Sequence, residues 1–163
     1  MGNLGQSSIR GVTLIELMVV LAVLAILLTI AAPALTNFIR DNRVTAQSNE
    51  LSSLIAFARS QSTGSLSGYE LSIDSAGNGW SAEVRNLGCS PSCVEKDSTF
   101  TNTALTVVNG SLPLRFNDRA VLTSSEVTLA LQHNPCAGQR QRVELNVLIS
   151  GSVRTNRVEC SND

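Results

Sequence analysis

A nearly unbroken apolar run near the N-terminus dominates the pattern of hydrophobic and polar positions. It comprises 21 residues, Val12 to Ala32, of which only Thr13, Glu16 and Thr29 are not apolar. As an α-helix this run is roughly 31 Å long, about the thickness of the hydrocarbon core of a bilayer. The pattern therefore predicts a membrane-spanning helix.

Helical spacing continues beyond the apolar run. Pro33 lacks a backbone donor, and we expect it to kink the helix without ending it. Apolar residues recur at helical spacing over 35–39 and again over 51–58, with the charged stretch 40–43 between them, and Gly64 is a suitable C-terminal cap. The pattern predicts one helix from about residue 13 to about residue 62. Its first half is apolar all round, whereas its second half is amphipathic and needs a packing partner.

After Gly64, short alternating stretches separated by turn residues are typical of antiparallel strands. Three hairpins are expected, the second turning at Asn109-Gly110 and the third at Ser150-Gly151. Pro113 predicts that its strand lies at a sheet edge or at a bulge. The expected strands are Tyr69 to Ile73, Trp80 to Arg85, Leu105 to Val108, Leu112 to Phe116, Glu126 to Leu131, Arg142 to Ile149 and Ser152 to Val158.

The residues at the start of the apolar run resemble the class III signal of type IV pilins and type II secretion pseudopilins. The segment is Gly11-Val12-Thr13-Leu14-Ile15-Glu16-Leu17. The resemblance implies that a prepilin peptidase cuts between Gly11 and Val12 and methylates the new N-terminus at Val12. Glu16 then becomes the fifth mature residue, where the family keeps its glutamate. One departure is Val12, because the family usually has Phe after the cut.

Glu16 is the residue of this run that most needs a physical explanation. A carboxylate at mid-membrane costs about 2.5–3.5 kcal/mol on insertion scales, and less near an end. Together with the resemblance, this predicts that Glu16 pairs with the new α-amino group of a neighbouring subunit during assembly. Two alternatives remain open. Glu16 is favoured at a membrane edge by the helix dipole, or the run is an ordinary secretory signal ending at Ala32-Pro33-Ala34, which its length and Glu16 oppose.

The later part of the chain adds to the resemblance. Four segments are similar to the globular part of the GspH/FimT group of minor pilins and pseudopilins. They are the tract Leu114-Arg115-Phe116-Asn117-Asp118-Arg119, the strand near 126–131, Arg142 to Ile149 and Gly151-Ser152-Val153-Arg154. This implies an α+β fold, in which a long N-terminal helix packs against an antiparallel β-sandwich-like C-terminal domain. The expected organisation is a leader peptide (1–11), a transmembrane and assembly helix (12–34), an amphipathic helix half (35–64) and a periplasmic β domain (65–163).

Four cysteines lie beyond the apolar run, and an even number there predicts disulfides in an oxidising periplasm. Three pairings are open, of which we prefer the sequential one. The alternative is a zinc site with His133 as a further ligand, but C-x3-C spacing with scattered partners is a poor zinc motif. His133 is instead expected to be a solvated turn residue. The cysteines are Cys89, Cys93, Cys136 and Cys160.

The formal net charge of −1 provides no overall field that recruits nucleic acid or acidic lipid. The sequence contains no catalytic, phosphate-binding or metal motif, so we expect neither an enzyme nor a cofactor. Some FimT-like minor pilins bind DNA through a C-terminal G-R-x-R motif, but here Ser152 replaces its first arginine. The alternative is a solvated strand face balanced by acidic residues. The candidate DNA contacts are Arg140, Arg142, Arg154 and Arg157.

Together these features predict a minor type IV pilin or pseudopilin that assembles through its N-terminal helix into a pilus or pseudopilus. Such fibres serve pilus biogenesis, protein secretion or DNA uptake. The protein is expected to cross the bacterial inner membrane once, with its C-terminal domain in the periplasm. Its expected partners are other pilin or pseudopilin subunits, the prepilin peptidase and the inner membrane. The alternatives are a type II secretion pseudopilin at the fibre tip and a DNA-binding minor pilin for natural transformation.

Overall fold

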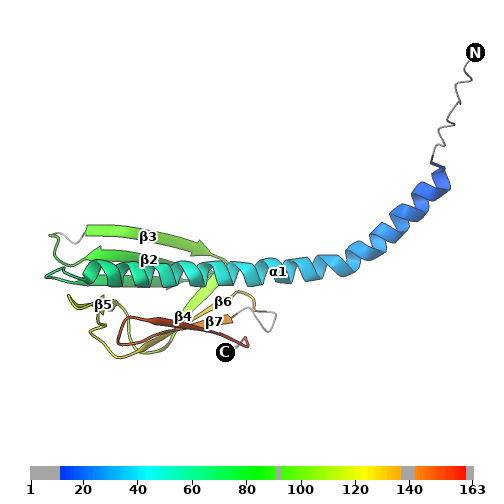
Figure 1. The fold of residues 1–163 in the computed structure, drawn as a ribbon. Coiled ribbons are helices and arrows are strands. Elements are labelled where there is room, and N and C mark those ends of the chain that lie inside the picture. Colours follow the sequence, from blue (N-terminus) through cyan, green and yellow to red (C-terminus); the bar gives the residue numbers. More distant parts are fainter. Residues whose placement is uncertain (1–11, 91–92, 137–141, 161–163) are drawn as a thin grey trace, which may run out of the picture. The chain divides into compact units, whose positions relative to one another are not determined.

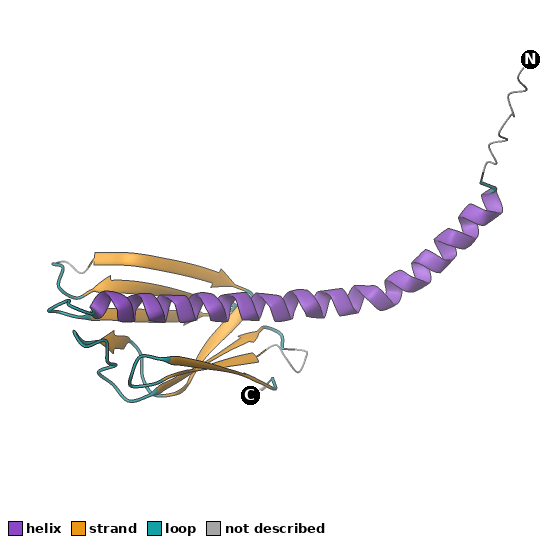
Figure 2. Cartoon of the chain, in the orientation of Figure 1, coloured by secondary structure: helices purple, strands orange, loops and turns teal. Residues whose placement is uncertain are grey.

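The computed structural model describes residues 12–90, 93–136 and 142–160. The chain divides into two compact units, with the boundary between Asn37 and Phe38. The long helix α1 (Leu14–Ser62) contributes residues to both units (Figure 1). The strands all belong to the second unit (Figure 2).

The first unit contains the apolar part of α1. Pro33 lies inside the helix and does not end it, as expected. The large apolar side chains from Leu14 to Ile30 are all exposed, with exposed fractions between 48% and 76%. Helix α1 is long and apolar enough to cross a membrane, and the most apolar window within it has a mean hydropathy of 2.9. The predicted extent of the helix is therefore confirmed.

In the second unit, one face of α1 becomes buried. The buried apolar positions recur three, four or seven residues apart, which places them on one side of the helix. Gly64 follows the helix with a φ of +82°, a conformation suited to a C-terminal cap. The buried apolar residues of this face are Val44, Leu51, Leu54, Ile55 and Ala58.

In the described residues, eight strands form two antiparallel sheets, each of four strands. The first sheet has the order β3-β2-β1-β5, and the second has the order β4-β6-β7-β8. The fold class is therefore α+β, with a long N-terminal helix and two antiparallel sheets in the C-terminal part, as predicted. The strands are β1 (Tyr69–Ala76), β2 (Gly79–Asn86), β3 (Cys93–Thr101), β4 (Thr103–Asn109), β5 (Leu114–Phe116), β6 (Val127–His133), β7 (Arg142–Val147) and β8 (Val153–Val158).

The pairing of β1 with β2 and of β7 with β8 confirms the first and third expected hairpins. The second expected hairpin is wrong, because β4 pairs with β6 and β5 pairs with β1. Pro113 has no N–H to donate to a partner strand, and β5 begins only after it. Its three residues lie at the edge of the first sheet, as Pro113 predicted.

Strand β3 is absent from the sequence prediction. It is the other edge strand of the first sheet, and its sequence includes Glu95, Lys96 and Asp97 in succession. Most of its residues are exposed, so it does not show the apolar alternation of a half-buried strand. Charged residues are common on edge strands, where they discourage pairing with other chains.

The core lies between the two sheets and the buried face of α1. Leu71 and Val84 contribute from the first sheet, and Leu129 and Leu145 contribute from the second, each fully buried. Leu54 contributes from the centre of the helix face and is equally buried. Because the aromatic residues are few, aliphatic side chains make up most of this core.

A buried polar cluster joins α1 to both sheets. The indole Nε1 of Trp80 on β2 donates to Gln47 Oε1 and to Thr103 Oγ1, each at 3.1 Å. The Thr103 hydroxyl on β4 also donates to Gln47 Oε1. The Gln47 amide in turn donates to the backbone carbonyl of Thr101 at 3.2 Å. This cluster satisfies buried polar groups and fixes the position of α1 against β2 and β4.

Candidate functional site

The N-terminus of α1 carries the residues for which the sequence predicted processing and assembly. Gly11 lies outside the described residues, and Val12 is exposed just before the helix. The Thr13 hydroxyl accepts a hydrogen bond from the Glu16 backbone N–H at 3.2 Å. The Thr13 carbonyl accepts the first intrahelical bond, from Leu17 N–H at 3.2 Å. Thr13 is therefore the N-cap of α1.

Sequence reasoning missed this role of Thr13, although the signal was present. A Ser or Thr followed three residues later by Glu is the pattern of a capping box at a helix start. In Thr13-Leu14-Ile15-Glu16, the threonine and the glutamate occupy those two positions. The same four residues thus form part of the prepilin-like motif and define where the helix begins.

Glu16 differs from the other polar side chains of the apolar run. The Thr29 hydroxyl donates to the Ile26 carbonyl at 2.7 Å, so it is satisfied within the helix. Thr13 is engaged as the cap. In the described part of the chain, no side chain forms an ion pair or hydrogen bond with the exposed Glu16 carboxylate. Its position in the first turn is favoured by the helix dipole, but its charge has no counterion there.

The cysteines form two disulfides at separate places in the second unit. Cys89 and Cys93 bracket the loop between β2 and β3, with Cα atoms 5.6 Å apart. Cys136 and Cys160 join the segment after β6 to the segment after β8, with Cα atoms 5.9 Å apart. Among the described residues, no group of three or more His, Cys, Asp and Glu side chains is arranged to hold a metal ion.

His133 is not the solvated turn residue that the sequence suggested. It is the last residue of β6 and is only 6% exposed. Its ring Nδ1 lies 3.2 Å from the carbonyl oxygen of Pro135. The expectation failed because the strand continues two residues past Leu131, and His133 falls on the inward side of the alternation.

The three candidate DNA-binding arginines that the structure describes do not form one patch. Arg140 lies outside the described residues. Arg142 is mostly buried and pairs with Glu144 at 3.1 Å. Arg157 donates to the Thr45 hydroxyl on α1 at 2.8 Å. Because side chains alternate along a strand, Arg154 points to the opposite face of β8 from Arg157.

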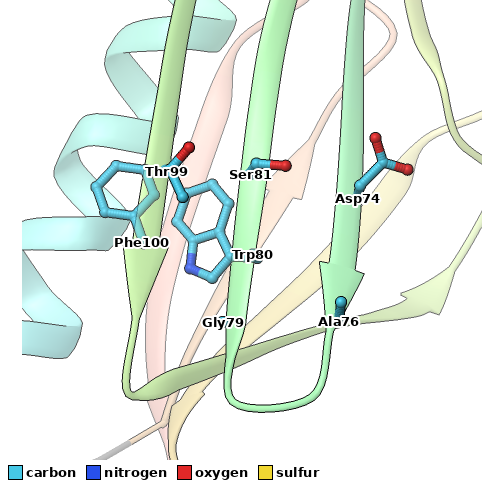
Figure 3. Close-up of a pocket in the computed structure, with 7 residues that line it drawn as sticks. All are labelled: Asp74, Ala76, Gly79, Trp80, Ser81, Thr99 and Phe100. Carbon is cyan, nitrogen blue, oxygen red and sulfur yellow. The ribbon is translucent and has the colours of Figure 1, made fainter.

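A cavity of about 230 Å³ lies at one end of the first sheet (Figure 3). Trp80 and Phe100 stack beside it with ring centroids 4.2 Å apart. Asp74, Ser81 and Thr99 form a row across β1, β2 and β3. This lining combines one carboxylate and two hydroxyls with apolar rings, and contains neither histidine nor cysteine. It does not supply a nucleophile with an adjacent base.

Among the described residues of the second unit, Tyr69 has a clearly shifted pKa. It is 5% exposed, and its hydroxyl donates to Glu95 Oε1 at 2.9 Å. The hydroxyl also accepts a hydrogen bond from Asn86 Nδ2 at 3.1 Å. Burial raises the pKa of Tyr69, and the hydrogen bond to Glu95 and the charge of that carboxylate raise it further. The group links β1 to the edge strand β3 and has a structural role.

Residues 6–32 match the family model of the prokaryotic N-terminal methylation motif. The matched segment includes Gly11, Val12 and Glu16, and it identifies a type IV pilin-like prepilin signal. No curated protein and no solved structure matches the chain. The motif supports a type IV pilin-like protein and indicates a structural subunit rather than an enzyme. Such a protein is processed by a prepilin peptidase and assembles with other pilin subunits, and the apolar helix is consistent with a membrane anchor.

Proposed function

We propose that this protein is a minor pilin or pseudopilin of the GspH/FimT type, which enters a fibre through its N-terminal helix. Residues 1–11 form the leader, which is cut between Gly11 and Val12, and Val12 is then methylated. Residues 12–34 anchor the subunit in the inner membrane and later pack in the fibre. Residues 35–64 and 65–163 form the periplasmic part.

The observation that carries this proposal is the unpaired Glu16 carboxylate within the apolar, exposed first part of α1. The other polar groups of the run are satisfied locally, so the cost of Glu16 in lipid is not offset inside the subunit. A methylated α-amino group at Val12 of a neighbouring subunit is a suitable counterion. Pairing would neutralise both charges as the helices come together.

The second unit supports the proposed location. Both disulfide pairings require an oxidising compartment, such as the periplasm, to persist. Strand β3 carries charged residues along its edge, which suits a subunit that must remain soluble outside the membrane before assembly. The same fold would serve a pilus or a secretion pseudopilus, including a position at the fibre tip.

DNA binding is a weaker alternative, because the basic side chains are separated. Arg142 is paired and Arg157 turns toward α1, which leaves Arg154 as an exposed cation on its face of β8. A single phosphate contact gives a shallow salt dependence, with a log–log slope of about −0.9. If the measured slope were several times steeper, and if Arg154→Ala made it shallow again, the DNA-uptake interpretation would be supported instead.

The proposed processing is tested by the intact mass of the membrane-extracted protein. We expect a chain that starts at methylated Val12. Gly11→Val should leave the precursor uncut, because the peptidase requires the glycine in this type of signal. A mature chain starting after Ala34 would instead establish ordinary secretion and overturn the proposal.

A further inference from the structure

Arg59 is a basic residue whose side chain is partly buried, and one of its buried N–H groups has no hydrogen-bond acceptor. It lies in the last turn of α1. Its Nε atom is buried and has no hydrogen-bond partner. In the described part of the chain, none of the ion pairs involves Arg59. A buried guanidinium N–H that lacks an acceptor is costly, so a partner is expected in the working state of the protein.

Three segments meet at this arginine and hold it in place. The end of α1 is tied to the turn after β5 by a hydrogen bond from Gly64 N–H to the Asp118 carbonyl, at 3.4 Å. That turn is tied to the segment after β7 by a bond from Leu122 N–H to the Ile149 carbonyl, at 2.8 Å. The Arg59 stem packs over Gly151, where an added Cβ would lie 2.7 Å from Arg59 Cδ. The guanidinium is thus preorganised by its surroundings.

A small cavity opens beside Arg59. Its volume is about 180 Å³, and Arg59, Ser60, Thr63 and Ala120 help to line it. This leaves room for several water-sized groups, each of about 30 Å³ in the liquid. Ala120 has a φ of +59°, which is unfavourable for a residue other than glycine. A strained residue, two hydroxyl-bearing side chains and an arginine with a buried, unpartnered Nε therefore line one cavity.

We propose that this cavity, the Arg59 pocket, receives the carboxylate of an acidic side chain from a neighbouring pilin-type subunit. The planar guanidinium matches a carboxylate in shape and charge, and none of the ion pairs in the described part of the chain involves Arg59. The pocket lies at the C-terminal end of α1, where the helix dipole is negative. That field opposes any anion, but it opposes a phosphate that carries nearly two charges more than a singly charged carboxylate, and the guanidinium must offset the smaller cost. This inference rests on the proposed function, because assembly brings the neighbouring subunit.

The ordinary alternative is that Arg59 only compensates the helix dipole at the end of α1. The two interpretations differ in their response to added anions. If the pocket takes a carboxylate, acetate should raise the Tm of the full-length protein in detergent micelles above its value in chloride at equal ionic strength. Arg59→Met should lose this excess, because it keeps the stem but not the guanidinium. The exposed Arg154→Met is the matched control and should retain it.

An equal response to acetate and chloride in the wild-type protein would overturn the proposal. So would an excess that survives in Arg59→Met, or a larger rise with inorganic phosphate than with acetate. If Arg59→Met fails to fold, Arg59→Lys is used to test whether the acetate excess in Tm depends on the guanidinium. It keeps the charge but lacks the planar fork, so loss of most of the acetate excess supports the proposal and full retention contradicts it.

Fibre incorporation separates this inference from the proposed function. We expect Arg59→Met to enter fibres about tenfold less than Arg154→Met, since a charge-assisted contact is lost. Equal incorporation of the two variants would refute the role of the Arg59 pocket while leaving the pilin function intact. If the wild-type protein itself does not enter fibres, the proposed function fails, and the acetate experiment still decides whether the pocket binds a carboxylate.

Discussion

The buried cluster around Gln47 offers the sharpest test of how α1 is held by the second unit. Gln47→Ala removes one of the two acceptors of Trp80 Nε1, the acceptor of the Thr103 hydroxyl, and the donor to the Thr101 carbonyl. Trp80 and Thr103 remain bonded to each other, so the loss is partial. Net hydrogen bonds contribute about 1 kcal/mol each, and a buried group left without a partner costs about 1–3 kcal/mol. We therefore expect Gln47→Ala to reduce the free energy of unfolding by about 2–4 kcal/mol.

The assay is denaturant unfolding of the full-length protein in micelles, followed by the fluorescence of Trp80. This residue is the sole tryptophan and belongs to the cluster itself. Gln61→Ala is the matched control, because Gln61 lies on the same helix and is exposed. Its effect should stay within about 0.5 kcal/mol.

A Gln47→Ala variant as stable as Gln61→Ala would refute the reasoning. A double-mutant cycle adds a second check. Because Gln47 and Thr103 contact each other, their substitution by Ala and Val should show a coupling of about 0.5–3 kcal/mol. Simple additivity of the two effects would mean that the hydrogen bond between them contributes nothing measurable.

The remaining predictions concern Glu16, a disulfide and Tyr69. Glu16→Ala should leave membrane insertion intact and reduce fibre incorporation, since removing a charge favours lipid; unchanged incorporation would argue against the pairing role. Replacing Cys136 and Cys160 by serine should lower the free energy of unfolding by about 3 kcal/mol, judged by denaturant midpoint, because the link closes a loop with a sequence separation of 24. The pKa of Tyr69 is raised on folding, so its contribution to stability is complete below pH 10 and is lost as pH rises through the folded pKa. Tyr69→Phe should flatten that alkaline loss, and an unchanged pH profile would contradict the assignment.

The sequence by itself determined the long N-terminal helix and the prepilin-like motif at its start. The run from Val12 to Ala32 is apolar on every side, so its helical form and its sufficient length to cross a membrane follow from composition and length alone. The start of the helix is likewise local, because Thr13 caps it through the Glu16 N–H. The hairpins β1–β2 and β7–β8 join neighbours in sequence, and alternation with turn residues was sufficient to predict them.

Only the tertiary structure decided which strands share a sheet. Asn109-Gly110 is a strong local turn signal, yet β4 pairs with β6 and β5 pairs with β1. The burial of Leu114 and Phe116 against the core outweighs the local preference for a hairpin. The pattern of apolar and polar residues did not predict strand β3, because an exposed edge strand needs no apolar face.

The same limit applies to the polar residues that matter most. Gln47 and Arg59 occupy ordinary helical positions, and nothing in their neighbouring sequence distinguishes them from Gln61 or Arg43. Gln47 is buried because Trp80 and Thr103 reach it from two sheets. The Nε atom of Arg59 is buried without a partner because separate turns close around the side-chain stem. Local periodicity specifies which face of a helix is apolar, but the partners of a polar side chain are set by segments distant in sequence, which come together only when the chain folds.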